Sequence, residues 1–341
     1  MRTPVPFDLD LTVRSHGFYD LAPWSWDPAR RVLARPLLLG PGRAVHAEVA
    51  ERGGPGGGLA VRLTAEGRLT AAESDEARRQ LSAALGLDED LAPFYALVRG
   101  LAGRQAPPLP DPPPLRRGGK GRAARDPLAF PSIGQRATRR DRLPDLLWAA
   151  ERGAGRMLRS PTVFEDAVKT LCTTNCSWAL TRAMTSKLVS ELGEPAPGGG
   201  RTFPTAAAMA SRSERFYRDV IRAGYRAPFL AALAREVASG ALDLETWRGS
   251  ALDTAALGAR IAVLAGFGPY ATEHLLRLLG RHDHLALDSW TRAKLARLRG
   301  RRRQPTDRAI RRWYAPFGRY AGLAMWLEVT ADWHQPNPAW P

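Results

Sequence analysis

The sequence is poor in cysteine and contains no long apolar run. Only two cysteines, Cys172 and Cys176, occur in 341 residues, which excludes a disulfide framework and any four-cysteine zinc or iron–sulfur site. Their spacing within a helical pattern favours packing in a core over a role as metal ligands. No apolar run approaches the roughly 18 residues that span a membrane, and the start, MRTPVPFDLD, lacks the charged-then-apolar order of a secretory signal. We therefore expect a soluble, cytoplasmic protein with no membrane partner.

Acidic residues are scarce relative to basic ones. Lys and Arg together number 50 against 34 Asp and Glu, which leaves a formal charge of +16. A basic surface gains affinity for polyanions by releasing their counterions, so this balance favours a nucleic-acid partner. The alternative is a compositional bias, because the chain is rich in Arg, Ala and Gly throughout. Charge alone leaves both interpretations open.

Residues 1–100 have the pattern of a sheet followed by a helix. Alternating or apolar stretches bounded by Pro/Gly-rich turns predict antiparallel strands at FDLDLTV (7–13), RRVLARPLLL (30–39), RAVHAEVAE (43–51) and GLAVRLTAE (58–66). The period becomes helical from Glu73 to Val98, with Ser74 or Asp75 as the N-cap. These residues are expected to form an N-terminal antiparallel sheet domain that carries a helix.

Two further regions follow the sheet. Residues 101–142 include PPLPDPPP and RRGGKGRAAR, whose prolines and like charges cannot build a core, so we interpret them as a mobile basic connection or insertion. Contact with a nucleic acid and a tolerated surface insertion are equally compatible with that composition. Residues 143–341 are mostly helical: one helix is capped by Ser160 and started by Pro161, and others lie at 254–265, 269–280 and 288–299. The predicted fold class is therefore α+β.

The residues suited to chemistry concentrate in LAGFGPYATEHLLRLLGRHDHLALDSWTR (264–292). Gly266 and Gly268 permit a close backbone approach, and Pro269 suits the first turn of the next helix. The free N–H groups and the dipole at that helix start would hold one phosphate. Asp288 follows an apolar run, and its simplest role is to cap the helix that follows. A partly buried carboxylate can also stabilise an oxocarbenium-like sugar and orient a water, as cleavage of a glycosidic bond requires.

LAGFGPYATEHLL followed by LALDSWTR resembles the hairpin and catalytic-aspartate signature of the helix-hairpin-helix DNA glycosylase superfamily. Residues 160–184 resemble the superfamily's helix whose polar turn probes the base opposite the lesion. Residues 222–230 resemble the Gly-Tyr-Arg-Ala segment of its 8-oxoguanine glycosylases, and residues 319–327 resemble their C-terminal pocket helix. The predicted sheet fits their first domain. The resemblance thus covers most of the chain except residues 103–142. It implies a monomeric, nucleoid-associated repair enzyme that flips a damaged nucleotide out of double-stranded DNA.

The resemblance implies roles at matching positions. Asp288 would be the catalytic carboxylate. Asn175 would fill the space left by the flipped nucleotide, Tyr225 would wedge into the base stack, and Arg226 would hold DNA beside it. In the hairpin, three residues would offer N–H groups to the strand: Gly266, Gly268 and Tyr270. Backbone atoms in the same hairpin would bind a monovalent cation that bridges to phosphate, at Ala262, Leu264 and Phe267. No other cofactor is implied.

Three positions depart from the family pattern. Tyr270 stands where bifunctional members carry a lysine that attacks the sugar, and a phenol cannot form a Schiff base. The pocket glutamine that reads 8-oxoguanine is replaced by Met325, and an expected Arg aligns near Leu180. We therefore expect excision by water without β-lyase activity, as in the alkylpurine-excising branch.

The base pocket implied by the resemblance would be apolar and aromatic. Its predicted lining is Trp178, Met325 and Trp326, joined by Phe18 or Trp24. Such a lining would suit a cationic alkylated purine through stacking and cation–π attraction.

The sequence thus predicts a monofunctional DNA glycosylase of base-excision repair. Two alternatives stay open: a non-catalytic DNA-binding or damage-sensing module, and a bifunctional 8-oxoguanine glycosylase/lyase. His282, Asp283 and His284 could ligate a metal, but we interpret them as a surface turn. The run RGRRR at 299–303 either contacts phosphate or is simply solvated.

Overall fold

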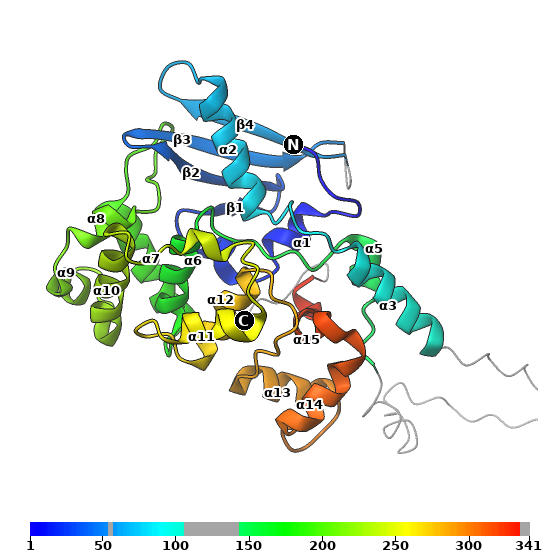
Figure 1. Cartoon of the computed structure of the whole chain (residues 1–341). Helices are drawn as coiled ribbons and strands as arrows, with labels where there is room; N and C mark the ends of the chain where they lie inside the picture. Colours follow the sequence, from blue (N-terminus) through cyan, green and yellow to red (C-terminus); the bar gives the residue numbers. More distant parts are fainter. Residues whose placement is uncertain (54–56, 106–142, 335–341) are drawn as a thin grey trace, which may run out of the picture.

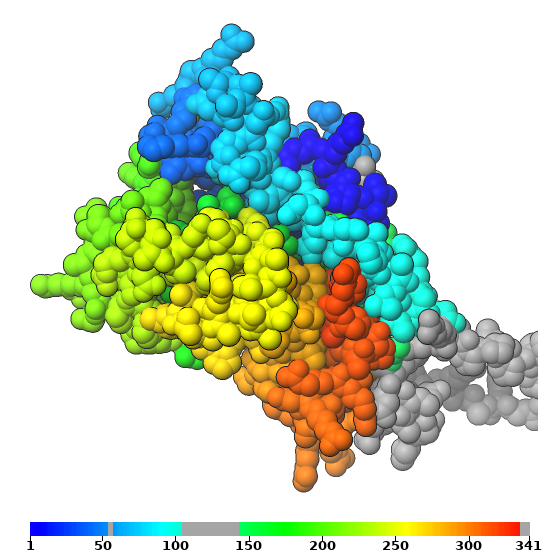
Figure 2. Space-filling model, viewed as in Figure 1, coloured from blue at the N-terminus to red at the C-terminus, as the bar shows by residue number. Residues whose placement is uncertain are grey.

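The computed structural model describes residues 1–53, 57–105 and 143–334. An antiparallel sheet lies at the N-terminal end and a larger helical part follows it (Figure 1), which confirms the predicted α+β class. Figure 2 shows the sheet part, coloured blue to cyan, lying directly against the helical part. Within the described ranges, no helix combines the length and the apolar character needed to cross a membrane.

The sheet has four strands that follow one another in space as in the chain: β1 (Ser25–Asp27), β2 (Val32–Gly40), β3 (Arg43–Glu51) and β4 (Leu59–Ala65). All neighbouring strands are antiparallel. Alternate side chains such as Val45 and Val49 are buried, and helix α2 (Ala71–Ala84) packs Ala77 and Leu81 into the same core. The strands predicted between residues 30 and 66 are therefore confirmed.

The strand predicted at residues 7–13 is wrong. These residues form the short helix α1 (Leu9–Val13), whose first turn is capped by Asp8, which accepts a hydrogen bond from the Leu11 N–H at 3.1 Å. Leu9, Leu11 and Val13 are all buried. A short helix enclosed on several sides has no single apolar stripe, so its residues can alternate like those of a strand.

The helical stretch predicted from residue 73 to 98 is two helices, α2 and α3 (Ala92–Gln105). Thr70, rather than Ser74 or Asp75, caps α2: it forms a reciprocal capping box with Glu73. The chain leaves α2 through Gly86, whose φ of +60° favours glycine. Since α3 continues to Gln105, the first residues assigned to the basic connection are helical. The rest of it, residues 106–142, lies outside the described residues.

The helical part contains eleven α-helices in the described residues from 143 onward: α5 (Leu147–Arg152), α6 (Val163–Thr173), α7 (Trp178–Leu192), α8 (Ala206–Ala210), α9 (Glu214–Asp219), α10 (Ala227–Ala238), α11 (Thr254–Ala262), α12 (Pro269–Leu278), α13 (Ser289–Leu298), α14 (Asp307–Tyr314) and α15 (Ala321–Val329). Short 3₁₀ turns flank them, among them η1 (Gly17–Asp20), η2 (Gly224–Arg226) and η5 (Ala331–His334). The three helices predicted between residues 254 and 299 are confirmed, with ends shifted by one to three residues.

Helix α6 runs through the middle of the larger helical core. Its N-cap is Thr162, whose hydroxyl accepts from the Glu165 N–H at 3.2 Å, and not the predicted Ser160. Ser160 is buried upstream of the helix, where its N–H donates to Asp166. Cys172 is buried in this core and Cys176 packs at its edge, both as free thiols, so their packing role is confirmed.

Candidate active site

The turn between α11 and α12 forms the predicted hairpin. Gly266 has a φ of +86°, and a Cβ atom there would lie 2.6 Å from the Phe229 Cδ2 atom, so only glycine fits. Gly268 is the N-cap of α12 and Pro269 is its first residue; no side chain of the described residues caps this end. Tyr270 is 43% exposed and Val263 is 82% exposed. The start of α12 is therefore open to a partner, as an anion site requires.

The two glycines of the hairpin are expected to differ sharply in their tolerance of a side chain. Gly266→Ala should lower the free energy of unfolding by about 1–3 kcal/mol, because the new methyl group meets Phe229 in a left-handed backbone. Gly268→Ala is the matched control: its Cβ would meet nothing within 4 Å and its φ is −72°. Its effect should stay below about 1 kcal/mol. Urea denaturation of both variants measures the difference, and equal losses would contradict this account of the turn.

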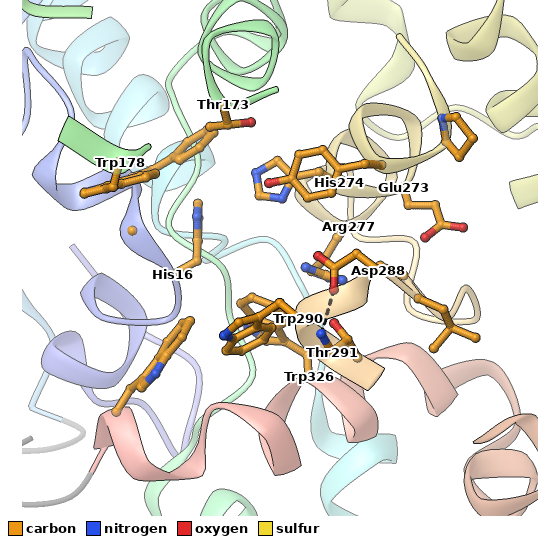
Figure 3. A pocket seen from close by; sticks show the side chains of 17 residues that line it. His16, Thr173, Trp178, Glu273, His274, Arg277, Asp288, Trp290, Thr291 and Trp326 are labelled. Carbon is orange, nitrogen blue, oxygen red and sulfur yellow. Dashed lines mark hydrogen bonds between the residues drawn. The ribbon is translucent and has the colours of Figure 1, made fainter. Parts of the chain in front are cut away.

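Asp288 is the N-cap of α13. Its Oδ1 accepts a hydrogen bond from the Thr291 N–H at 2.7 Å, so the capping role weighed from the sequence is real. Its Oδ2 has no hydrogen bond within the described parts of the chain, and the residue lines the large pocket beside α12. Figure 3 shows the carboxylate at the edge of this pocket, close to Arg277 and above Trp290. Capping therefore fixes the carboxylate without using both of its oxygens.

The pocket encloses about 580 Å³ and is built from parts of the chain that lie far apart in sequence. The N-terminal turn, the α6–α7 junction, α12, the start of α13, α15 and η5 all contribute to it. Its lining residues are His16, Gly17, Phe18, Thr173, Trp178, Pro269, Tyr270, Glu273, His274, Arg277, Ala286, Leu287, Asp288, Trp290, Thr291, Trp326 and Trp333.

Aromatic rings form much of the wall. Trp290 packs against Trp326 and Trp333, with ring centroids 6.3 and 5.7 Å apart. Trp178 is held by the hydrogen bond from its Nε1 to Asp20, at 2.9 Å. Trp326 donates its Nε1–H to the Ser15 carbonyl, also at 2.9 Å. The rings are thus fixed in place and can offer flat apolar faces to a planar ligand.

Three of the five predicted pocket residues line this cavity: Phe18, Trp178 and Trp326. Met325 does not, because it is fully buried in the core around α15. Trp24 is buried beneath the sheet with the Arg35 guanidinium over its ring at 4.5 Å. Neighbours on a helix point about 100° apart, so a segment match alone does not show which of them faces a cavity.

The inner wall of the pocket is polar and includes residues that the sequence did not single out. The Nε2 of His16 donates to the Leu158 carbonyl at 2.6 Å, and burial lowers the pKa of His16 to about 4. Burial also lowers the pKa of His274 well below its ordinary value, and its Nε2 has no partner in the described structure. Both rings are therefore neutral at pH 7. The ring of Tyr270 stacks on His274 with centroids 6.0 Å apart.

Arg277 completes this wall. Its guanidinium lies 4.1 Å from the centroid of the Trp326 ring, and burial lowers its pKa to about 10, which still leaves it charged at pH 7. Tyr270, His274 and Arg277 recur every three or four residues along α12, so they share one face of the helix. This spacing is the feature of the sequence that could have placed His274 and Arg277 on the same helix face as Tyr270. It could not distinguish a pocket wall from a core.

Two residues predicted to enter the duplex, Asn175 and Tyr225, contact each other. Asn175 adopts a left-handed φ of +45° in the turn between α6 and α7, and its Nδ2 donates to the Tyr225 hydroxyl at 3.3 Å. Tyr225 is 51% exposed. Arg226 is instead buried: it packs on the Tyr225 ring and donates to the Thr174 carbonyl. In this position the side chain braces the turn that carries Asn175, and its contact with DNA stays a prediction.

The remaining candidates have structural partners. His282 is buried and bonded to Glu89, so it does not belong to a surface turn; Asp283 accepts from the Thr254 hydroxyl at 2.7 Å. No group of three or more potential ligands occurs among the described residues. In the 299–303 run, Arg299 is buried and pairs with Glu328 at 2.9 Å. Arg299 and Arg301 both lie over Trp313 at 4.9 Å, so these two pack on the protein.

No protein-family model matches the sequence, and no curated protein matches it significantly. Solved structures do match. The 3-methyladenine DNA glycosylase of Archaeoglobus fulgidus is similar with a TM-score of 0.67 and 17% identity, over 96% of this chain and 97% of that one. MBOgg1 in complex with a low-affinity DNA ligand gives 0.63 at 16% identity, over 96% and 92%. The 8-oxoguanine glycosylase/lyase of Clostridium acetobutylicum gives 0.57 at 14% identity, over 92% and 93%.

The chain has the fold of the DNA glycosylases. The resemblance seen in the hairpin and in the Asp288 segment is thereby confirmed at the level of the fold, over nearly the whole chain. The similar structures differ in the lesions that they are named for, 3-methyladenine and 8-oxoguanine. The reaction and the substrate of this chain must therefore be argued from its own pocket.

Proposed function

We propose that this protein is a monofunctional DNA glycosylase of base-excision repair that removes a damaged purine, with alkylated purines as the expected class of lesion. The observation that carries the proposal is Asp288. One carboxylate oxygen caps α13, and the other is available to a ligand in the aromatic pocket. The pocket is lined by α12, the helix that begins at the exposed hairpin. A carboxylate held in this way can stabilise the positive charge that develops on the deoxyribose and orient a water toward C1′.

Binding of double-stranded DNA by a monomer is part of the proposal. It is supported by the formal charge of +16 and by the uncapped start of α12, where the N–H groups of Gly268 and Tyr270 suit a phosphate. MBOgg1, one of the similar structures, is in complex with a DNA ligand. Carbonyl groups of Ala262, Leu264 and Phe267 remain the proposed ligands of a monovalent cation at the same turn.

Access to the bond requires the target nucleotide to leave the stack. Asn175 and Tyr225 lie side by side on an exposed edge, where they can occupy the vacated space. The pocket volume of about 580 Å³ falls in the range of small-molecule sites, and the rings of Trp178 and Trp290 offer stacking surfaces. The extruded base would thus exchange its stacking in the duplex for stacking in the protein.

The absence of lyase activity is a direct prediction. No lysine lines the pocket within the described residues, and Tyr270 cannot form a Schiff base. Sodium borohydride should therefore trap no covalent enzyme–DNA adduct on a damaged duplex, and abasic strands should break only after alkali or heat. Tyr270→Lys is the matched variant, because it places an amine beside the sugar site, and we expect it to give a trapped adduct. A trapped adduct with the unaltered protein would show that another amine attacks C1′.

Base release tests the proposed function as a whole. The full chain is incubated with duplexes that carry one alkylated, oxidised or deaminated base, and alkali-labile abasic sites are measured over time. We expect release of at least one damaged purine. The alternative function, a non-catalytic damage sensor, predicts that the protein binds such duplexes and releases no base from any of them.

A further inference from the structure

Arg277 is a buried cation that forms no ion pair within the described part of the chain. Its side chain is 9% exposed and lines the pocket. Its guanidinium lies over the face of Trp326, and it forms no hydrogen bond and no ion pair with any described residue. Asp288 acts on it electrostatically without forming an ion pair, and Figure 3 shows the guanidinium turned toward that carboxylate and the pocket. Burying an unpaired charge destabilises a protein by several kcal/mol, so a guanidinium kept in this position calls for an explanation.

Arg277 is the one positively charged side chain among the described residues that line the pocket. His16 and His274 are neutral because burial lowers the pKa of each, to about 4 for His16. Of the two carboxylates in the lining, Glu273 lies 2.9 Å from the His284 ring nitrogen, which leaves Asp288 as the unpaired anion. The pocket therefore holds one cation on its inner wall and one anion near its edge. Charges of opposite sign fixed at two places suit a reaction that separates charge between them.

Cleavage of an N-glycosidic bond separates charge in this way. When the C1′–N9 bond of a purine nucleotide breaks, both bonding electrons stay with the base, and the sugar becomes positive. A neutral base thus becomes an anion, whose charge spreads over its ring nitrogens and exocyclic groups. A base that already carries a positive charge, such as 7-methylguanine or 3-methyladenine, departs as a neutral molecule. Only the first kind of leaving group gains from a guanidinium on the inner wall.

Resting on the proposed glycosylase function, we infer that Arg277 is a catalytic residue that stabilises the departing base as an anion, so that the pocket selects neutral damaged purines over cationic ones. In the complete step, water adds to C1′ and gives one proton to the Asp288 carboxylate. The base anion, held by the Arg277 N–H donors, takes up a proton from solvent as it leaves. The unpaired Nε2 of His274 offers a second polar contact to the same edge of the base.

This inference revises the expectation that the aromatic wall attracts a cationic base. The Trp326 face that would supply cation–π attraction is already covered by the protein's own Arg277. A second cation placed beside it would be repelled at short range in a site shielded from water. Neutral alkylated purines such as 1,N6-ethenoadenine remain within the class of alkylated purines. The deaminated purine hypoxanthine lies outside that class but within the wider class of damaged purines.

The test compares two lesion classes under single-turnover conditions with the full chain. Duplexes carry 1,N6-ethenoadenine or hypoxanthine as neutral bases, and 7-methylguanine or 3-methyladenine as cationic bases. The unaltered protein should excise a neutral base faster, relative to its spontaneous loss, than a cationic base. Arg277→Met should slow excision of the neutral base by about 100- to 1000-fold, and should leave or increase the rate on the cationic base. Arg277→Lys, which keeps the charge, should retain most of the neutral-base activity.

The other possible outcomes contradict either the inference about Arg277 or the proposed glycosylase function. Equal losses on both lesion classes in Arg277→Met would show that Arg277 only maintains the structure, and would overturn the inference. An unaltered protein that excises cationic bases alone would overturn the inference and leave the proposed glycosylase function standing. No excision of any of the four lesions would overturn the inference, and the base-release assay over the wider set of lesions would then decide whether the glycosylase function stands. The preference of the unaltered protein needs no variant, so the test holds even if Arg277→Met fails to fold.

Discussion

Asp288→Asn should lower the single-turnover rate of base excision by at least about a hundredfold, equivalent to roughly 3 kcal/mol of transition-state stabilisation. The amide keeps an oxygen that can accept the Thr291 N–H, which now donates at 2.7 Å, so the cap of α13 should survive. The amide loses the negative charge that would face the positive sugar and the basicity that would accept the proton of water. Affinity for a duplex should stay within about a few-fold of the unaltered protein, because phosphate contacts dominate binding.

The control for this change is Asp253→Asn. Asp253 caps α11 just as Asp288 caps α13, accepting the Ala256 N–H at 2.7 Å, but it lies outside the aromatic pocket. It should retain full excision activity with the same small effect on stability. Excision and duplex binding by fluorescence anisotropy are measured on both variants. Excision activity retained in Asp288→Asn would rule out the carboxylate mechanism. An equal loss of activity in Asp253→Asn would show that weakened helix capping, and not the missing charge, causes the loss in Asp288→Asn.

Glu165→Gln should lower the free energy of unfolding by about 3–5 kcal/mol. Glu165 on α6 accepts two hydrogen bonds from the Arg35 guanidinium of β2, at 3.2 and 2.9 Å, and lies 2.7 Å from the Lys169 ammonium. All three side chains are buried. Burial pushes the pKa of Glu165 up, yet the charges of Arg35 and Lys169 outweigh that effect and hold it below its ordinary value. Removing the one carboxylate leaves two like charges facing each other in the interior.

The comparison variant is Glu76→Gln. Glu76, partly exposed on α2, pairs with the exposed Arg79 at 2.6 Å and accepts a hydrogen bond from Gln80 at 2.8 Å. The amide of Gln still offers an oxygen to Gln80, and a solvent-accessible ion pair contributes about 0–1 kcal/mol. Urea denaturation at pH 7 gives both values from the shift in midpoint at constant slope. A loss below about 1 kcal/mol for Glu165→Gln would show that Arg35 and Lys169 find water or other partners. Since Arg35 belongs to the sheet and Lys169 to α6, the same measurement tests how firmly the sheet is joined to the helix that leads to Asn175.

The cluster around Glu165 illustrates a limit of the sequence. Lys169 has no motif around it, and Arg35 sits in an apolar strand that could equally have exposed it. Their burial depends on β2 packing against α6, 130 residues away along the chain. Pairing across such a distance leaves no local pattern, so neither residue could be predicted to be buried. The pocket wall formed by His16, His274 and Arg277 escaped prediction for the same reason.

What the sequence determined by itself was local. Turn glycines, alternating strands and the apolar run before Asp288 act through neighbours in the chain, so the sheet, the hairpin and the capped carboxylate could be predicted from them. The tertiary structure decided which side chains enter the pocket: Trp326 rather than Met325 on α15, and Arg277 on α12. A periodic pattern identifies one face of a helix, but whether that face meets a core, a cavity or solvent depends on elements that only the complete fold brings together.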